Sequence, residues 1–320
     1  MSFAPGKLFL LGEYAVLHGG IALVTAVDRG IRAELRSDRD GYRVAGADLD
    51  QKLPIRVLDH GDRAELLQRL SVDVSAFFEG KTKLGLGSSA ASSVAILKAA
   101  RPELSAAEVF RIADRAHREH QAGRGSGADV AASAFGGTIS YRLSVRWAQH
   151  PWIGTPPQET QVEPLKLPAD LRFVAVWMGD AASSTELSGK VAKLVLHEDV
   201  RATLSSIAST ASYGVGACVN DDAQSLMDAL SSGDALMERL GEQTGAPIIC
   251  EGHRALREFA AEFGLVAKPS GAGGGDFSIV AGPKHSRWLR FCADLADLGL
   301  RAIPLEFGYS PDSESEEHSP

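Results

Sequence analysis

A glycine-rich segment that leads into an alanine-rich stretch constrains this chain more than any other feature. Residues 84–91 read Leu-Gly-Leu-Gly-Ser-Ser-Ala-Ala, and residues 89–100 carry Ala, Val, Ile and Leu at helical spacing. Glycines let a backbone approach a ligand closely, and the first turn of a helix presents N–H groups without partners. The pattern predicts a phosphate-binding helix start, in which Ser88 and Ser89 add hydroxyls for phosphate oxygens or Mg²⁺. The alternative is a glycine turn with a serine helix cap.

This loop differs from two common nucleotide-binding motifs. It lacks the Gly-Lys-Ser/Thr of a Walker A loop, and Gly85-x-Gly87 lacks the third glycine of the dinucleotide fingerprint. Two further glycine-rich loops, Gly123–Asp129 and Lys268–Asp276, each contain a serine and an aspartate. Three such loops in one chain favour ligand binding over plain connections.

Two charged residues are candidates for chemistry at these loops. Asp129 is a candidate general base, because a carboxylate beside a flexible backbone can meet a substrate hydroxyl; the alternative is a helix N-cap. Lys7 begins an apolar run and is either a solvated strand end or an ammonium that holds the base ionised. His117 and His120, three residues apart and without a third ligand, are more typical of polar helix surface than of a zinc site.

Length and composition exclude several classes of protein. The 320 residues suggest about two domains. A net charge of -8 argues against a protein that mainly grips nucleic acid or an anionic membrane. Three cysteines far apart indicate neither a disulfide framework nor a cysteine-rich zinc site. No apolar run reaches the ~18 residues that span a bilayer, and the first residues lack a secretory signal, so we expect a cytoplasmic chain.

Apolar periodicity predicts a mixture of strands and helices without a strict repeat, which indicates two α+β domains. Ser105 and Glu108 form a capping-box pattern, and the five prolines of residues 150–168 indicate a long connection. Expected strands include 7–11, 21–27, 173–178 and 302–307, and expected helices include 89–100, 105–121, 186–197, 223–240, 253–263 and 288–298. The expected domains are 1–165 and 166–310, with a disordered acidic tail over 311–320.

Three motifs in order resemble those of the galactose, homoserine, mevalonate and phosphomevalonate kinase superfamily (GHMP kinases). They are Ala4–Lys7 with Gly12–Leu17, then Gly85–Ala91, then Ser270–Asp276, and the resemblance covers nearly the whole chain. It implies a two-domain α+β kinase with a ribosomal-protein-S5-like N-terminal domain and a ferredoxin-like C-terminal domain. It also implies ATP and Mg²⁺ as cofactors, and an acceptor bound between the domains.

The resemblance assigns roles to individual residues. Asp129 would orient or deprotonate the acceptor, and Lys7 would stabilise the ionised state and the transferring charge. The ATP triphosphate would lie on Gly85, Leu86, Gly87, Ser88, Ser89 and Ala90. Ser88 would contact the metal or the phosphates. Mevalonate kinases carry a magnesium-binding Glu eleven residues before the catalytic Asp; here that position is Arg118, so Glu119 is the second candidate metal ligand.

Four details resemble phosphomevalonate kinases more than mevalonate kinases. They are the segment from Ala116 to Ala132, the segment from Trp177 to Leu187, Asp276 in place of a fourth glycine, and Tyr14 where a His is usual. They imply ATP-dependent phosphorylation of 5-phosphomevalonate to 5-diphosphomevalonate in the mevalonate/isoprenoid pathway. The alternatives are mevalonate kinase, another small-molecule GHMP kinase, or a non-catalytic sensor.

The acceptor implied by the resemblance is a small molecule with a carboxylate and a phosphate, which calls for cations. His117, Arg118, Arg124 and Lys190 are candidates, although each is equally a solvated residue. The full set of expected acceptor contacts is Glu13, Tyr14, His117, Arg118, Ser126, Gly127, Ser184, Thr185, Lys190, Gly271, Ala272, Gly273 and Asp276. The oligomeric state is open.

Overall fold

The computed structural model describes residues 1–38, 41–46, 57–58, 63–80, 82–120, 125–145, 159–179 and 184–311. The chain separates into two compact units, one of residues 1–7, 25–137 and 306–320, the other of residues 8–24 and 138–305. Strands β1 (Ser2–Leu11) and β2 (Ile21–Leu35) each contribute residues to both units. This division therefore does not coincide with the boundary expected at residue 165, which stays a prediction.

The first unit contains part of a six-stranded sheet. The strands that lie wholly or partly in this unit are β1, β2, β3 (Arg43–Ala45) and β4 (Leu70–Asp73). β2 pairs with β1 and runs antiparallel to β4, and β3 runs parallel to β4. The remaining short elements of this part are α1 (Arg63–Arg69), η3 (Ser75–Phe77), β5 (Phe78–Glu79) and β6 (Thr82–Lys83).

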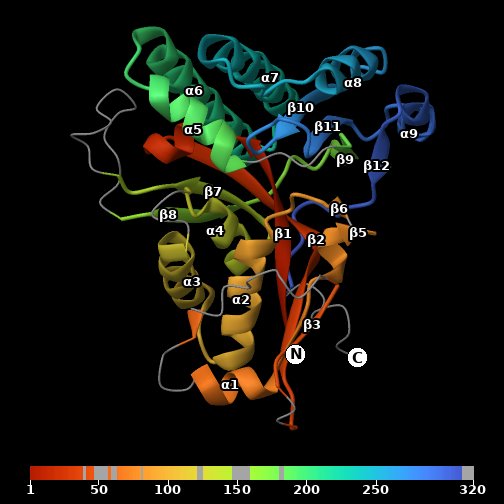
Figure 1. Cartoon of the computed structure of the whole chain (residues 1–320). Helices are drawn as coiled ribbons and strands as arrows, with labels where there is room; N and C mark the ends of the chain where they lie inside the picture. Colours follow the sequence, from red (N-terminus) through yellow and green to blue (C-terminus); the bar gives the residue numbers. More distant parts are fainter. Residues whose placement is uncertain are drawn as a thin grey trace. The chain divides into compact units, whose positions relative to one another are not determined.

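Three mutually packed helices complete the first unit (Figure 1). They are α2 (Ser88–Ala100), α3 (Ala106–His120) and α4 (Ala128–Phe135). α2 is buried along most of its length, because its small Ala and Ser side chains let neighbouring helices approach. The capping box at the start of α3 is confirmed: the Ser105 N–H donates to Glu108 Oε2 over 2.9 Å, and the Glu108 N–H donates to Ser105 Oγ over 3.4 Å.

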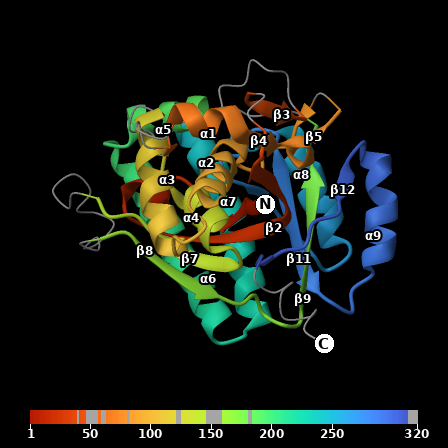
Figure 2. The ribbon, with the colours of Figure 1, turned by 90° about the horizontal axis from the view of Figure 1, so that it is seen from below.

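The second unit contains a four-stranded antiparallel sheet in the order β10-β11-β9-β12. Figure 2 shows β11 beside β9. The bounds are β9 (Leu171–Trp177), β10 (Val266–Ser270), β11 (Phe277–Pro283) and β12 (Arg301–Ile303). Helices separate β9 from β10 and β11 from β12, which is the β-α-β-β-α-β pattern of ferredoxin-like domains. The expectation for this part of the chain is confirmed.

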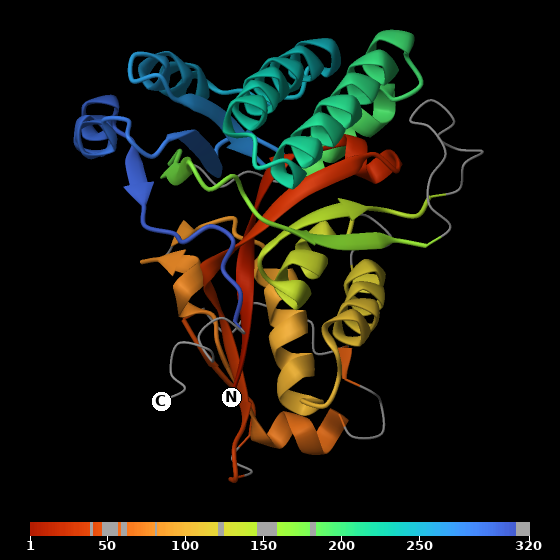
Figure 3. The same cartoon turned by 180° about the vertical axis from the view of Figure 1, so that it is seen from behind.

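Helices of the second unit pack into two clusters. α8 (Glu251–Ala261) and α9 (Trp288–Asp294) contribute Leu256, Trp288 and Phe291 to a core with β9 and β10. α6 (Glu198–Val219) and α7 (Ala223–Thr244) lie side by side (Figure 3). Other elements of the unit are η1 (Ala15–His18), β7 (Thr138–Arg142), β8 (Gln161–Leu165), α5 (Ser184–Leu194) and η6 (Leu295–Leu298).

Two expectations are wrong at the level of elements. The proline-bearing connection contains β8, which pairs antiparallel with β7; Pro164 is tolerated because β8 is the last strand in its sheet order. The expected helix 186–197 ends earlier, at Leu194, and is followed by the longer α6, which the sequence analysis did not identify. The acidic tail, apart from residue 311, lies outside the described residues. None of the described helices is both long and apolar enough to cross a membrane.

Leu11, the last residue of β1, fits between α6 and α7 because each helix has a glycine there. A methyl group on Gly214 would overlap Leu11 Cδ1, and one on Gly233 would lie 2.9 Å from Leu11 Cδ2. Leu11 is 1% exposed, so it has little room to move aside. We expect Gly214→Ala to lower the free energy of unfolding by about 1–3 kcal/mol through overpacking.

Gly216→Ala is the matched control on the same helix. Nothing lies within 4 Å of a methyl group at Gly216, so this variant should gain about 0.5–1 kcal/mol from helix propensity. Urea unfolding of both variants checks the pair. Equal stabilisation by both substitutions would contradict the packing argument.

Candidate functional site

Lys7 and Asp129 flank the glycine that begins α2. A methyl group placed on Gly87 would lie 3.3 Å from Lys7 Cε and 3.8 Å from Asp129 Cβ. The Lys7 N–H donates to the carbonyl of Leu86 over 3.0 Å, which fixes β1 against the glycine-rich loop. An ammonium-bearing and a carboxylate-bearing side chain therefore meet at the predicted phosphate loop.

The start of α2 leaves backbone donors available. Gly87 is the N-cap, with a left-handed φ of 85°, and no side chain caps the helix. Only at Ala91 does the helical pattern begin, with its N–H donating to the Gly87 carbonyl over 3.1 Å. The alternative of a serine cap is therefore wrong. The residues predicted to bind the phosphates are consecutive. Gly85, Leu86 and Gly87 lead into α2, and Ser88, Ser89 and Ala90 are its first three residues.

Asp129 lies in the first turn of α4, which starts in the same way. Gly127 is the N-cap with φ 81°, again without a side-chain cap, so the N-cap alternative for Asp129 is wrong. The Val130 N–H donates to Asp129 Oδ1 over 3.0 Å, and the Ala128 N–H donates to Ser126 Oγ over 3.2 Å. The N-terminus of a helix carries partial positive charge and favours anions. The hydrogen bond from Val130 thus holds the Asp129 side chain at the start of α4.

Arg118 holds the turn that precedes Asp129. Its Nε donates to Asp114 Oδ2 over 2.6 Å, and its Nη2 donates to the Ser126 carbonyl over 2.7 Å. A methyl group on Gly127 would overlap Asp114 Oδ1, so only glycine fits there. Burial raises the pKa of Asp114, and the charge of Asp129 acts in the same direction while Arg118 opposes both. Arg118 is thus a bridge between α3 and the 125–127 turn.

The sequence predicts that His117 lies on a polar helix surface. This prediction is wrong, because His117 is only 2% exposed. The side chain of His120 lies outside the described residues, as does all of Arg124. Among the described residues, no group of three or more His, Cys, Asp or Glu side chains has the arrangement of a metal site. The zinc alternative therefore has no support in the described part of the chain.

The residues around Gly87 suit a magnesium ion that is shared with phosphates. Mg²⁺ prefers hard oxygen donors and usually binds one or two carboxylates, waters and phosphate oxygens. The hydroxyl of Ser88, at the first position of α2, and the carboxylate of Asp129 are donors of this kind. Glu119 is exposed on α3, and its role as a ligand stays a prediction.

In the second unit, the turn after β1 contacts the third glycine-rich loop. Lys268 Nζ donates to Glu13 Oε1 over 2.5 Å, and the Tyr14 hydroxyl donates to the Ala272 carbonyl over 2.5 Å. At the end of the loop, the Met178 N–H donates to the Asp276 carbonyl over 3.0 Å. These contacts join the turn at Glu13 and Tyr14 to Lys268 and Ala272. The roles of Glu13, Tyr14, Gly271, Ala272, Gly273 and Asp276 as acceptor contacts stay predictions.

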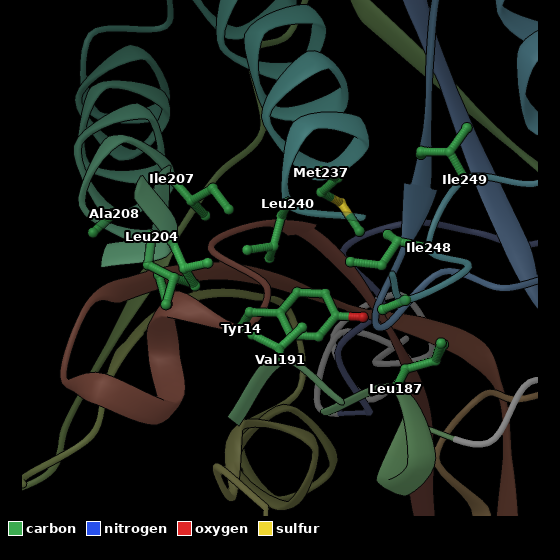
Figure 4. Packing of buried hydrophobic residues seen from close by; sticks show 13 residues of the cluster. Tyr14, Leu187, Val191, Leu204, Ile207, Ala208, Met237, Leu240, Ile248 and Ile249 are labelled. Carbon is green, nitrogen blue, oxygen red and sulfur yellow. The ribbon is translucent and has the colours of Figure 1, made fainter. Parts of the chain in front are cut away.

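Figure 4 shows the ring of Tyr14 among apolar side chains, with Val191, Leu240 and Ile248 around it. The hydroxyl of Ser270, at the start of the same loop, is buried and has no hydrogen-bond partner among the described residues. Buried hydroxyls normally find a partner, so an orphan of this kind is a candidate contact for a polar ligand. The third glycine-rich loop thus lies beside an apolar cluster and contains a buried hydroxyl that is available to a ligand.

The remaining predicted contacts lie on α5. Ser184 and Thr185 are exposed at its start, and Lys190 forms an ion pair with Glu186 over 3.5 Å. This pair is four residues apart on one helix face, an ordinary surface arrangement. Within the described residues, none of these three side chains forms a hydrogen bond or ion pair with the third loop.

Sequence reasoning missed a group of charged side chains on α7, α8 and β10, of which Asp234, His253 and Lys268 are buried. Asp234 Oδ2 lies 3.1 Å from Arg257 Nε, and Arg257 also donates to Glu238 over 2.8 Å. His253 and Lys268 are buried nearby in the fold, on α8 and β10. Helical spacing cannot distinguish such charges from solvated ones, because their partners come from other elements. The sequence hint at this group was the four-residue spacing of Asp234 and Glu238 on one expected helix.

Asp234 gives the second unit a pH-dependent stability. Burial raises the pKa of Asp234 from 3.8 to about 6, against the opposing charges of Arg257 and Lys268. The native state thus retains a proton that the unfolded chain releases between pH 4 and 6, so rising pH removes stability. We expect the free energy of unfolding of the native sequence, relative to Asp234→Asn, to fall by up to about 3 kcal/mol over this range.

Urea unfolding between pH 4.5 and 7.5 checks this prediction. Asp228→Asn, which removes an exposed carboxylate from the same helix, is the matched control. Parallel curves for the native sequence and Asp234→Asn would contradict the prediction. The opposite effect of His253, whose pKa burial lowers to about 4, is present in all three proteins and cancels.

Comparison with known proteins gives a consistent result. A family model described as the GHMP kinases N terminal domain matches residues 55–137. A phosphomevalonate kinase from Streptomyces sp. is 31% identical, with 86% of this chain and 88% of that protein covered. A mevalonate kinase from Archaeoglobus fulgidus is 29% identical, with 88% and 92% covered.

Solved structures agree on the fold. Streptococcus pneumoniae phosphomevalonate kinase, in complex with phosphomevalonate and AMPPNP, superposes with a TM-score of 0.79 over 95% of this chain and 98% of that one. The sequence identity is 22%, so this likeness concerns the fold alone. Together with the three motifs and the helix starts described above, the matches show that this chain belongs to the GHMP kinases.

Proposed function

We propose that this protein transfers the γ-phosphoryl group of ATP to 5-phosphomevalonate, giving ADP and 5-diphosphomevalonate. The observation that carries the proposal is the placement of Lys7 and Asp129 on either side of Gly87, at the uncapped start of α2. A cytoplasmic location and a small-molecule acceptor are part of this proposal.

The first unit supplies the groups that phosphoryl transfer needs. Catalysis of this reaction consists mainly of positioning and of neutralising charge on the phosphates. The N–H groups at the start of α2 and the ammonium of Lys7 would bind phosphate oxygens, and the Ser88 hydroxyl would hold Mg²⁺. A bound Mg²⁺ supplies further charge neutralisation. Asp129 would orient the acceptor oxygen and take up a proton where one remains.

The choice of acceptor rests on the relatives and on particular residues. The Streptomyces relative named above is a phosphomevalonate kinase, and Tyr14 and Asp276 stand where mevalonate kinases usually carry other residues. A phosphate acceptor also makes a weaker demand on Asp129, since its oxygen is largely ionised near pH 7. Among the candidate cations, Arg118 bridges Asp114 and Ser126 and Lys190 pairs with Glu186, so the choice of acceptor does not rest on these cations.

A mevalonate kinase activity is the second candidate, favoured by the Archaeoglobus relative. The test is ADP release from purified protein with ATP and Mg²⁺, offered mevalonate and 5-phosphomevalonate separately. Turnover with 5-phosphomevalonate alone supports the proposal. Turnover with mevalonate alone overturns the acceptor assignment, and no turnover with either favours another acceptor or a sensor that has lost catalysis.

We expect Asp129→Asn to lower kcat by about 10²–10⁴-fold while ATP binding stays nearly unchanged. The amide keeps the shape of the side chain but neither attracts a proton nor carries the charge that orients the acceptor. Steady-state kinetics and ATP titration check this. Glu103→Gln, an exposed carboxylate of the same unit, is the control and should retain full activity. An Asp129→Asn enzyme with normal kcat would remove Asp129 from the reaction.

A further inference from the structure

A buried ion pair connects two segments that lie far apart in the sequence, at the first and the third motif. Lys268 is 1% exposed and Glu13 is 3% exposed. Lys268 Nζ donates to Glu13 Oε1 over 2.5 Å and to the Pro269 carbonyl over 2.6 Å. Glu13 follows β1, whereas Lys268 lies in β10, two residues before the Ser270–Asp276 motif. The pair therefore joins the first motif to the third within the second unit.

The side chain of Lys268 packs against α7. A methyl group on Gly233 of α7 would lie 3.5 Å from Lys268 Cε, so the aliphatic stem packs across that helix. Taking two charges out of water costs several kcal/mol per ion, and an apolar pair of similar volume is often at least as stable. Global stability alone is thus a weak reason for this pair, and a role in holding local geometry is the better explanation.

Tyr14, next to Glu13, shows that the turn is held in an unfavourable conformation. Its backbone has φ 61° and ψ -50°, in a region that L-residues rarely adopt. Such strain persists where the surrounding structure fixes the residue, and it is concentrated at functional sites. Two neighbours supply that constraint: the Glu13–Lys268 pair, and the hydrogen bond from the Tyr14 hydroxyl to the Ala272 carbonyl.

We propose that these two contacts, here named the turn–loop link, hold the Gly271–Asp276 loop in the geometry that binds the phosphoryl acceptor. Lys268 is then a positioning residue: it acts through Glu13 and the loop and does not touch the substrate. The inference rests on the proposed function, in which this loop contacts the acceptor. It separates acceptor affinity, set by the link, from ATP affinity, set by residues of the first unit.

The sharpest test removes one hydroxyl. Tyr14→Phe preserves the ring and its apolar contacts but loses the hydrogen bond to Ala272. We expect the KM for 5-phosphomevalonate to rise about fivefold, the equivalent of one hydrogen bond, with the KM for ATP unchanged. Tyr213→Phe is the matched control, because Tyr213 donates its hydroxyl to Ser225 on an exposed surface of the same unit. An unchanged acceptor KM in Tyr14→Phe, or an equal rise in both KM values, overturns the proposal.

The ion pair is tested by a double-mutant cycle of Lys268→Met, Glu13→Gln and the double variant. If the two residues act as one unit, each single variant raises the acceptor KM and the double variant adds little to the larger single effect. Lys284→Met, which removes an exposed lysine, is the control. Additive effects, or a loss of kcat without any change in KM, would indicate a purely structural pair. Should these variants fail to fold, Tyr14→Phe still decides.

A readout that is independent of turnover separates this inference from the proposed function. Amide hydrogen exchange of the native protein and Tyr14→Phe reports on the loop, in which the Gly274 N–H donates to the Ile248 carbonyl over 2.8 Å. Faster exchange confined to residues 271–276 supports the link even if 5-phosphomevalonate is not turned over, in which case the proposed function alone fails. Identical exchange in both proteins overturns the link, whatever the acceptor.

Discussion

Two helices of the first unit begin at a glycine in the left-handed conformation, and the candidate phosphate site depends on that constraint. A serine, threonine or aspartate at the N-cap would occupy the first backbone N–H groups with its own side chain. At Gly87 no side chain does so. At Gly127 the N-cap has no side chain either, but the Ala128 and Val130 N–H groups donate to Ser126 Oγ and Asp129 Oδ1. The fold places Lys7 and Asp129 beside Gly87, the first of these glycines. Because no side chain caps α2, its first backbone N–H groups remain available to a ligand.

The second unit solves a different problem, that of fixing a loop made largely of glycine. Such a loop has many accessible conformations, and an acceptor that had to select one would bind weakly. The loop is instead held from outside, by Tyr14 at Ala272, by Lys268 just before it and by Ile248 at Gly274. The strain at Tyr14 and the burial of two charges are costs of this arrangement, and they make sense where geometry matters more than stability.

The sequence was most informative where chemistry is local. The helix start at Ser88, the capping box at Ser105 and Glu108, and the grouping of Asp129 with a glycine turn all follow from neighbouring residues. It failed where a side chain's surroundings come from distant segments. His117 stands among charged residues in the sequence, as a surface position would, but its side chain is buried. The partner of Lys268 lies 255 residues away in the sequence. Periodicity reports which face of a helix is apolar, but not what a polar residue on that face meets.

Charge distribution explains how an acidic protein can favour phosphorylated ligands. A net charge of -8 opposes the long-range attraction of polyanions. Attraction must then be short-ranged and geometric: backbone N–H groups at a helix start, one lysine beside them, and a magnesium ion that accompanies the nucleotide. Of the lysines discussed, Lys268 is consumed by Glu13, whereas Lys7 lies at the glycine turn. In the proposed function, buried Lys268 would hold the shape of the loop, and half-buried Lys7 would supply charge at the helix start.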